Sequence, residues 1–160
     1  MPVEKLKKFL DEHNIKYVII KHSPAFTAQE VAGLAHVPGK EMAKTVLVLV
    51  DGKMAMTVLP ADNKVDFALL KKATGAKEVL LATEEEFKYR FPDCEVGAMP
   101  PFGNLYGMDV WIEKSLTKDE EIFFNACSHK DLIKMQYKDF ETLVQPKIGS
   151  FALKRNYHLV

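Results

Sequence analysis

The segment with the most unusual composition runs Gly-Ala-Met-Pro-Pro-Phe-Gly over residues 97–103. Its two adjacent prolines fix the φ angle and remove two N–H donors, while its glycines permit backbone conformations that other residues resist. A loop built in this way is stiff and holds its remaining N–H groups in one direction. Preorganised N–H groups are what a carbonyl oxygen or an oxyanion needs for stabilisation. The same composition also suits a rigid turn between a helix and a strand, so both interpretations stay open from composition alone.

A lysine, Lys44, stands with Thr45 directly before the apolar run Val46–Val50. A lysine that opens a core strand can point its ammonium group into a cavity while its aliphatic stem packs on apolar neighbours. There the cation could bind a phosphate or stabilise a developing negative charge. The alternative, which the residue type alone favours, is a solvated lysine at a strand edge.

The sequence Asn-Ala-Cys-Ser-His over residues 125–129 is the third candidate segment, and we expect it to form a turn. His129 suits the role of an acid, a base or a hydrogen-bond donor, because histidine titrates near neutrality. The adjacent Ser128 does not indicate a hydrolase triad, since neighbouring side chains rarely face each other and no Gly-x-Ser-x-Gly elbow is present. A loop histidine of this kind is also common as a structural hydrogen-bonding group.

The sequence gives no sign of a metal, a nucleotide or another cofactor. The five histidines are scattered, and the chain contains no H-x-x-x-H, H-E-x-x-H, Walker A or Rossmann glycine pattern. The two cysteines, Cys94 and Cys127, form no CxxC motif. We therefore expect two reduced thiols, rather than a disulfide framework or a cysteine-rich zinc site, and no cofactor.

The composition is that of a soluble globular protein. With 160 residues, of which 48% are hydrophobic, the chain is long and apolar enough to bury a core of its own. Its 22 basic and 22 acidic residues cancel, which argues against a generally basic nucleic-acid-binding protein but leaves a local basic patch open. The longest apolar run is far shorter than the roughly 20 residues of a membrane span, and residues 1–10 do not resemble a secretory signal. We expect a cytoplasmic protein that contacts neither membrane nor DNA.

Local patterns predict the elements that position these segments. Amphipathic spacing predicts a helix over residues 2–13, and capping boxes predict helices that begin after Thr27 and Thr83. Asp51-Gly52 between two apolar runs predicts a hairpin in the middle of the core. The other expected elements are strands at 17–20, 78–81, 108–112, 122–125 and 132–135, helices at 66–73 and 137–143, and a basic C-terminal segment, 147–160, that is either solvated or in contact with a polyanion. Short strands mixed with helices indicate an α+β fold around a mixed sheet or a small barrel.

Three sets of residues, in this order and at these separations, resemble the YbaK/EbsC family, also called the prolyl-tRNA synthetase-associated editing family. They are Ala43-Lys44-Thr45-Val46-Leu47, the loop at residues 97–103, and Cys127-Ser128-His129 with Lys134-Met135. The resemblance covers about residues 17–144. It implies a single editing domain over residues 1–160 with an α+β fold, in which a mixed, partly barrel-like β-sheet is surrounded by helices.

The resemblance also implies roles for individual residues. Lys44 matches the functional lysine of the family, and Gly97 and Pro101 match its Gly-x-x-x-Pro loop, whose backbone amides face the substrate carbonyl. His129 lies in the segment that matches the other side of the pocket. The candidate catalytic residues are therefore Lys44, Gly97, Pro101 and His129, and the candidate substrate-binding residues are Phe26, Thr45, Ala98, Met99, Pro100 and Ser128. Of these, Phe26 and Met99 are expected to line a small amino-acid pocket that selects by size.

The activity that the resemblance implies is that of a freestanding deacylase, which hydrolyses the ester at the 3′ end of mischarged aminoacyl-tRNA in trans. Because an aminoacyl ester is already activated, the protein need not supply a covalent nucleophile, and one oxyanion-hole donor contributes roughly 3 kcal/mol. The expected partners are the acceptor end of aminoacyl-tRNA and an aminoacyl-tRNA synthetase. The alternative is a non-catalytic module that binds aminoacyl-tRNA or a synthetase and retains the pocket without turnover.

Overall fold

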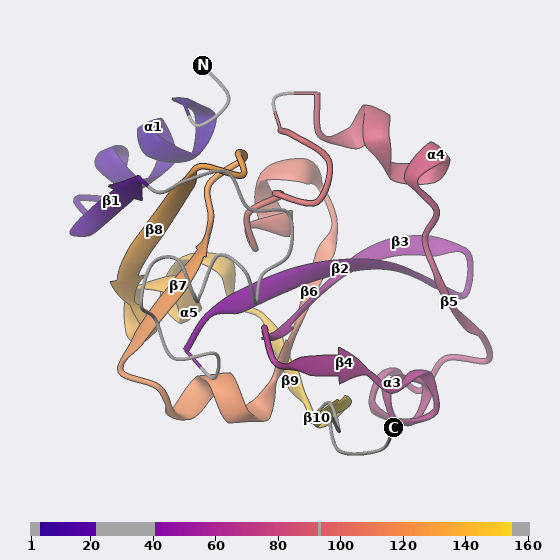
Figure 1. Cartoon of the computed structure of the whole chain (residues 1–160). Coiled ribbons are helices and arrows are strands. Elements are labelled where there is room, and N and C mark those ends of the chain that lie inside the picture. Colours follow the sequence, from indigo (N-terminus) through magenta and orange to yellow (C-terminus); the bar gives the residue numbers. More distant parts are fainter. Residues whose placement is uncertain (1–3, 22–40, 93, 155–160) are drawn as a thin grey trace, which may run out of the picture.

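A computed structural model describes residues 4–21, 41–92 and 94–154 (Figure 1). In these ranges the α-helices are α1 (Glu4–Glu12), α3 (Phe67–Thr74), α4 (Glu84–Phe87) and α5 (Tyr137–Val144), and 3₁₀ helices cover Lys88–Arg90, Gly103–Tyr106 and Lys114–Lys118. The strands are β1 (Tyr17–Lys21), β2 (Ala43–Val50), β3 (Lys53–Pro60), β4 (Asn63–Val65), β5 (Val79–Leu81), β6 (Asp109–Glu113), β7 (Glu121–Asn125), β8 (Asp131–Gln136), β9 (Lys147–Gly149) and β10 (Ala152–Lys154). None of the helices described is long and apolar enough to cross a membrane.

The strands form three sheets, and the predicted α+β class is confirmed. β5, β2, β3, β6 and β9 form a five-stranded sheet in that order, in which β2 is antiparallel to both neighbours and β6 is parallel to both of its own. β1, β8 and β7 form an antiparallel three-stranded sheet, and β10 pairs with β4. Figure 1 shows the three-stranded sheet on the left and β5 and α3 on the right. Over the described ranges the sheets stay open, without closing into a barrel.

The hairpin of β2 and β3 forms the centre of the larger sheet, as the sequence predicts. Asp51 and Gly52 both have positive φ angles, 49° and 80°, which suits the tight turn that joins right-twisted strands. The Asp51 carboxylate also accepts hydrogen bonds from the backbone N–H groups of Lys77 and Glu78, at 3.0 and 2.9 Å. The turn therefore anchors the start of β5 as well as joining β2 to β3.

The predicted helix ends are confirmed at α3 and α4. Asp66 caps α3 by accepting from the N–H of Leu69, and Gly75 ends that helix with a left-handed φ of 73°. Thr83 and Glu86 form the predicted capping box of α4. This helix has a single turn, and the chain continues directly after it as the 3₁₀ helix Lys88–Arg90.

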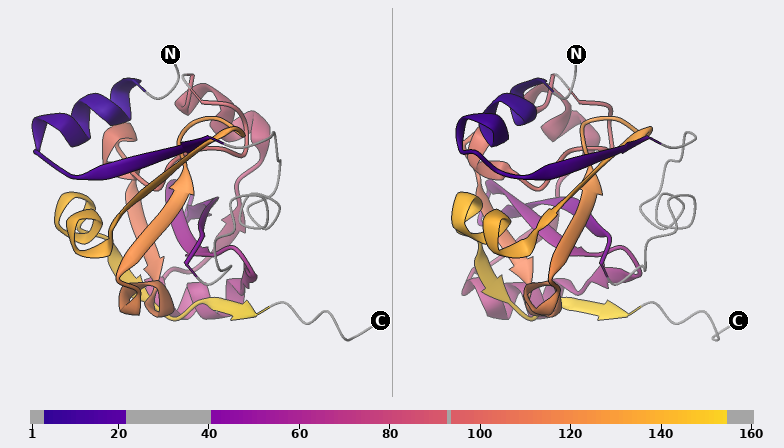
Figure 2. Two further views of the ribbon diagram at one scale, coloured as in Figure 1. Left: turned by 60° about the vertical axis from the view of Figure 1, so that its left-hand side comes forward. Right: turned by 90° about the vertical axis from the view of Figure 1, so that its left-hand side faces the viewer.

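Alternate residues of β2 face two different apolar clusters, because successive side chains of a strand point to opposite faces. Ala43 and Leu47 belong to the first cluster, which also contains Met99, Phe102, Phe124 and residues of α1 and α5. Val48 belongs to the second cluster, which also contains Leu59 and Phe151. In both views of Figure 2, α1 lies at the top of the molecule and β10 at the bottom.

The C-terminal strands β9 and β10 were not predicted. Most residues of 147–154 are exposed, in line with the solvated alternative, but the segment pairs with β4 and β6 and buries Phe151. Glu113 at the end of β6 explains why this segment returns to the fold. Its side chain is buried, and its Oε1 accepts hydrogen bonds from the N–H groups of Phe151 and Ala152, at 2.9 and 2.8 Å. One carboxylate thus satisfies two backbone donors and holds Phe151 in the second cluster.

We expect Glu113→Leu to lower the free energy of unfolding by at least about 2 kcal/mol, because it leaves two enclosed N–H groups without an acceptor. Urea denaturation followed by circular dichroism measures this change. Glu113→Gln is the matched control, since it keeps an Oε1 acceptor and should retain most of the stability. Equal losses in the two variants would show that the hydrogen bonds are not the cause.

Candidate functional site

The loop that contains Gly97 is tied to the turn after β7 by two backbone hydrogen bonds. The N–H of Glu95 donates to the carbonyl oxygen of Cys127, and the N–H of Cys127 donates to the carbonyl oxygen of Ala98, both at 2.9 Å. Cys94 and Cys127 also form a disulfide. The expectation of two reduced thiols is therefore wrong, because the fold brings together two cysteines that are 33 residues apart in sequence.

The His129 side chain is held between the loop and the turn. Its Nε2 atom lies 2.8 Å from the carbonyl oxygen of Val96, and its backbone N–H donates to the carboxylate of Glu95 at 3.3 Å. A carbonyl oxygen only accepts, so Nε2 carries the proton in this contact. With only 9% of its side chain exposed, His129 is placed to orient the loop rather than to exchange protons with a substrate.

This contact fixes the direction of the Gly97 N–H. The peptide bond between Val96 and Gly97 is trans, so its N–H points away from the carbonyl oxygen that His129 holds. Gly97 is exposed and has a φ of 86°, a left-handed conformation that favours glycine. The N–H of Ala98 is used by the carbonyl of Glu95, whereas the N–H of Gly97 donates to no residue that the structure describes. The site thus presents an oriented backbone donor at the surface.

The residues that follow Gly97 in the loop are buried and anchor the loop in the core. Ala98, Met99, Pro100 and Pro101 are buried, and Met99 packs in the first cluster. Met99 therefore contributes to the core, and it lines none of the three hollows that described residues form. The other residue expected to line the pocket, Phe26, lies outside the described residues.

Ser128 has a structural role in the turn. Its hydroxyl donates to the Asp131 carboxylate at 2.8 Å and accepts from the N–H groups of Lys130 and Asp131 at 3.1 and 3.0 Å. These three bonds use the whole hydrogen-bonding capacity of the hydroxyl. Ser128 is thus not placed to act as a nucleophile or to hold a substrate, although it was expected to bind one.

A bridge joins the chain directly before β2 to β7, close to where the strand that carries Lys44 begins. Met42 and Phe123 pair in parallel, and the N–H of Phe123 donates to the carbonyl of Glu41. Paired residues share a face, and the next pair along, Ala43 and Phe124, faces the first cluster. From this bridge both chains run in the same direction, and β7 leads on to the turn that contains His129.

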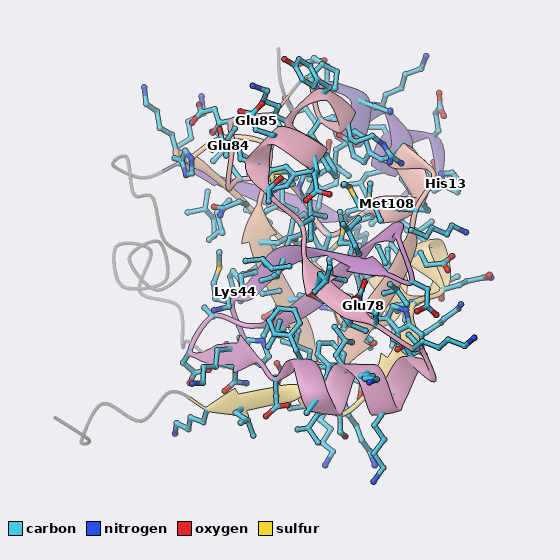
Figure 3. All side chains as sticks on the ribbon, turned by 90° about the vertical axis from the view of Figure 1, so that its right-hand side faces the viewer. His13, Lys44, Glu78, Glu84, Glu85 and Met108 are labelled. Carbon is cyan, nitrogen blue, oxygen red and sulfur yellow. A yellow bond between two sulfur atoms is a disulfide. The ribbon has the colours of Figure 1, made fainter. Side chains whose placement is uncertain are left out.

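Lys44 and Asn125 come two residues after the bridge on their respective strands. Because side chains alternate between the two faces of a strand, those of Lys44 and Asn125 lie on the same face as Met42 and Phe123, opposite the first cluster. Lys44 is half-buried and lies directly opposite the buried Leu59 of β3, which suits packing of its aliphatic stem. Figure 3 shows Lys44 at the opposite edge of the view from His13. Thr45 alternates to the other face, so it does not share a face with Lys44.

Asn125 is a buried polar residue near the turn that sequence reasoning did not single out. It is 8% exposed, and its Oδ1 atom is enclosed without a hydrogen-bond partner among the described residues. The available signal was a polar residue that ends the apolar run Ile122–Phe124 directly before the turn. An enclosed amide oxygen without a partner is unusual in a folded protein and calls for an explanation.

Hollows lined by described residues lie at several places on the molecule. One of about 630 Å³ lies beside α1 and Tyr17 and is lined mainly by charged side chains of that helix. None of the candidate residues lines it. The Tyr17 hydroxyl donates to Asp11 at 2.9 Å, and burial, followed by this bond, raises the pKa of Tyr17. This tyrosine therefore stays protonated at neutral pH and helps to join α1 to β1.

Comparison with known proteins gives consistent results. A family model described as the aminoacyl-tRNA editing domain matches residues 22–143. The prolyl-tRNA editing protein ProX of Acetoanaerobium sticklandii is 24% identical over 149 residues, which cover 89% of this chain and 90% of that protein. A proline–tRNA ligase of Bacillus mycoides is 31% identical over 100 residues, which cover 62% of this chain and 17% of the ligase. The crystal structure of a candidate trans-editing enzyme for prolyl tRNA synthetase covers 97% of this chain and 98% of its own, with a TM-score of 0.79 at 17% identity. That likeness shows a shared fold.

We expect reduction of the Cys94–Cys127 disulfide to lower the free energy of unfolding by about 3–4 kcal/mol, because the bond closes a long loop in the unfolded chain. Urea denaturation with and without dithiothreitol measures the change. The double variant Cys94→Ala/Cys127→Ala is the control and should not respond to the reductant. If dithiothreitol also leaves the free energy of unfolding of the wild-type protein unchanged, the disulfide pairing is contradicted.

Proposed function

The chain belongs to the aminoacyl-tRNA editing domain family, and we propose that it is a freestanding hydrolase that removes a mischarged amino acid from tRNA for proline in trans. The observation that carries the proposal is the oriented, exposed N–H of Gly97. A donor held in place before the reaction stabilises the charge that develops on an ester carbonyl oxygen. The comparisons with prolyl-tRNA editing proteins support the choice of tRNA.

In the proposed reaction, a hydroxyl oxygen of water or of the neighbouring ribose position attacks the ester carbonyl carbon. The carbonyl oxygen becomes an oxyanion and accepts a hydrogen bond from the N–H of Gly97. The bond from the carbonyl carbon to the ribose oxygen then breaks, and that oxygen takes up the proton that the attacking hydroxyl has lost. Attack by the ribose leaves a new ester, which water then hydrolyses. Among the described residues of this site none supplies a serine or cysteine nucleophile, because the Ser128 hydroxyl is used in the turn and Cys127 is in a disulfide.

His129 acts in this proposal as a positioning residue. It holds the carbonyl of Val96 and so keeps the Gly97 N–H aimed at the substrate. Lys44 supplies the positive charge of the site, which suits contact with the terminal phosphate of the acceptor end. The absence of net charge on the chain fits recognition of the terminal nucleotides rather than an extensive phosphate surface.

Deacylation of a defined panel tests the proposal. Purified protein is incubated with tRNA for proline that carries labelled alanine, serine, cysteine or proline, and release of the amino acid is followed. We expect at least one mischarged ester to be hydrolysed faster than the prolyl ester. Binding of these tRNAs without turnover would instead indicate a non-catalytic module.

We expect Gly97→Ala to lower the deacylation rate constant at least tenfold, because alanine strains a φ of 86° and turns the N–H away from its direction. The added Cβ itself fits, since its nearest neighbour is the Cε1 atom of His129 at 3.5 Å. Gly107→Ala is the matched control, with a φ of 70° and nothing within 4 Å of the added atom. Both variants should lose similar stability in thermal denaturation, whereas only Gly97→Ala should lose turnover. Equal turnover in the two would contradict a catalytic role for Gly97.

We expect Lys44→Ala to reduce kcat/KM for deacylation at least tenfold, a loss of about 1.4 kcal/mol in transition-state stabilisation. Lys53→Ala, at the exposed start of β3, removes the same charge elsewhere and should leave kcat/KM within about twofold of wild type. Because each variant removes one positive charge, a general electrostatic effect on tRNA binding would lower kcat/KM equally in both. An unimpaired Lys44→Ala enzyme would contradict the assignment.

A further inference from the structure

Strand β5 is an open edge of the five-stranded sheet. It comes first in the strand order, and among the described strands it pairs with β2 alone. The hydrogen bonds at its two ends show which way its backbone points. The carbonyl oxygen of Glu78 accepts from the N–H of Asp51 at 2.9 Å, and the N–H of Ala82 donates to the carbonyl oxygen of Leu47 at 3.0 Å. Both of these groups are therefore directed at β2 and the turn that follows it.

The backbone groups of Val79 and Leu81 point the other way. In an antiparallel pair, alternate residues direct their N–H and C=O groups at the partner strand, so Leu80 shares the inward direction of its neighbours at 78 and 82. Val79 and Leu81 then present their N–H and C=O groups away from β2, where no described strand lies. An open row of donors and acceptors is a template for a further strand.

The side chains at this edge are apolar and exposed on both faces of the sheet. Val79 is buried in the second cluster, whereas Leu80 is 50% and Leu81 is 59% exposed. Edge strands that stay unpaired commonly carry a charged residue or a proline, which discourages pairing. β5 contains neither. Its composition therefore favours contact with another apolar strand.

Opposite charges flank this apolar strand. Three exposed lysines precede it and three exposed glutamates follow it, namely Lys71, Lys72, Lys77, Glu84, Glu85 and Glu86. Within the described part of the chain none of these lysines forms an ion pair, and of the glutamates only Glu85 does, with Lys88. Figure 3 shows this side of the molecule, with Glu84 and Glu85 in the upper part and α3, which carries Lys71 and Lys72, in the lower part. The two ends of β5 thus differ in charge.

We propose that β5 is the interface of a homodimer, in which the β5 strands of two copies pair antiparallel about a twofold axis at Leu80. Hydrogen bonds join Val79 of each copy to Leu81 of the other, because these are the residues whose backbone groups face outward. The two Leu80 side chains meet at the axis, and each Leu81 lies opposite Val79 of the second copy. Pairing therefore covers both exposed leucines. This inference goes beyond the proposed function.

The charges favour a second copy of this chain as the partner. Antiparallel pairing places the N-terminal side of one β5 against the C-terminal side of the other, so the lysines of each copy face the glutamates of the other at both ends of the interface. In the proposed register Lys77 lies opposite Thr83 of the second copy, directly before its Glu84. Glu78 also lies on the basic side, where the three lysines outnumber it.

The interface leaves Lys44 uncovered by the pairing strands. β5 pairs with residues 48–50, at the end of β2, whereas Lys44 is at the start of that strand. Deacylation therefore does not require the dimer, and the dimer does not require deacylation.

Sedimentation equilibrium of the full chain tests the inference. We expect a reversible monomer–dimer equilibrium with a Kd of about 10–100 μM, as for a small interface. Leu81→Lys should raise this Kd at least about tenfold, because it places a charge at the centre of the edge. Ile148→Lys is the matched control, since Ile148 is 50% exposed on β9, the other edge of the same sheet. This control should keep the wild-type Kd.

Charge reversal tests the antiparallel register. Lys72→Glu/Lys77→Glu makes both ends acidic and Glu84→Lys/Glu85→Lys makes both ends basic, so each variant alone should dimerise at least about tenfold more weakly. An equimolar mixture of the two should form a heterodimer. The quadruple variant, which combines all four changes and keeps the net charge, should dimerise by itself as the wild-type chain does. Circular dichroism checks that each variant is folded.

The outcomes decide the inference independently of the proposed function. A wild-type chain that stays monomeric up to about 500 μM, or a dimer that Leu81→Lys and Ile148→Lys weaken equally, would overturn it. Double charge variants that dimerise as wild type, or a quadruple variant that does not dimerise, would also overturn it. If Leu81→Lys does not fold, the charge variants decide. A dimer that hydrolyses no mischarged tRNA would support this inference and overturn the hydrolase, whereas a monomer that hydrolyses one would do the reverse.

Discussion

The tie between the loop around Gly97 and the turn after β7 is the interaction on which the site depends. Two backbone hydrogen bonds and a disulfide join segments that are about 30 residues apart in sequence. Only with this tie in place can His129 reach the carbonyl of Val96 and set the direction of the Gly97 N–H. The donor that we propose to be catalytic is thus a property of the tertiary structure, since the same loop without its partner would leave the peptide free to rotate.

Elements whose signals are local could be predicted from the sequence. The hairpin at Asp51-Gly52 and the caps at Asp66 and Thr83 depend on residues within a few positions of one another. β9 and β10 could not be predicted, because each has three residues and both are held by contacts with distant parts of the chain. The decisive contact, from Glu113 to the N–H groups of residues 151 and 152, spans 38 and 39 positions and leaves no local pattern.

The same distinction holds within the site. Composition alone pointed to the loop at 97–103 and to His129, because paired prolines, glycines and a turn histidine are unusual in themselves. The roles of the side chains required the fold. Ser128 is turned inward by Asp131, Met99 packs in the core, and the thiol of Cys127 is bonded to Cys94. None of these three outcomes can be derived from residue type, since each depends on which partner the fold brings near.

A backbone N–H suits the role proposed for Gly97 because it is a neutral donor. In an empty site a neutral group costs less free energy than an unpaired charge would. Its hydrogen bond acquires its full strength only when charge develops on the substrate, so it favours the transition state over the ground state.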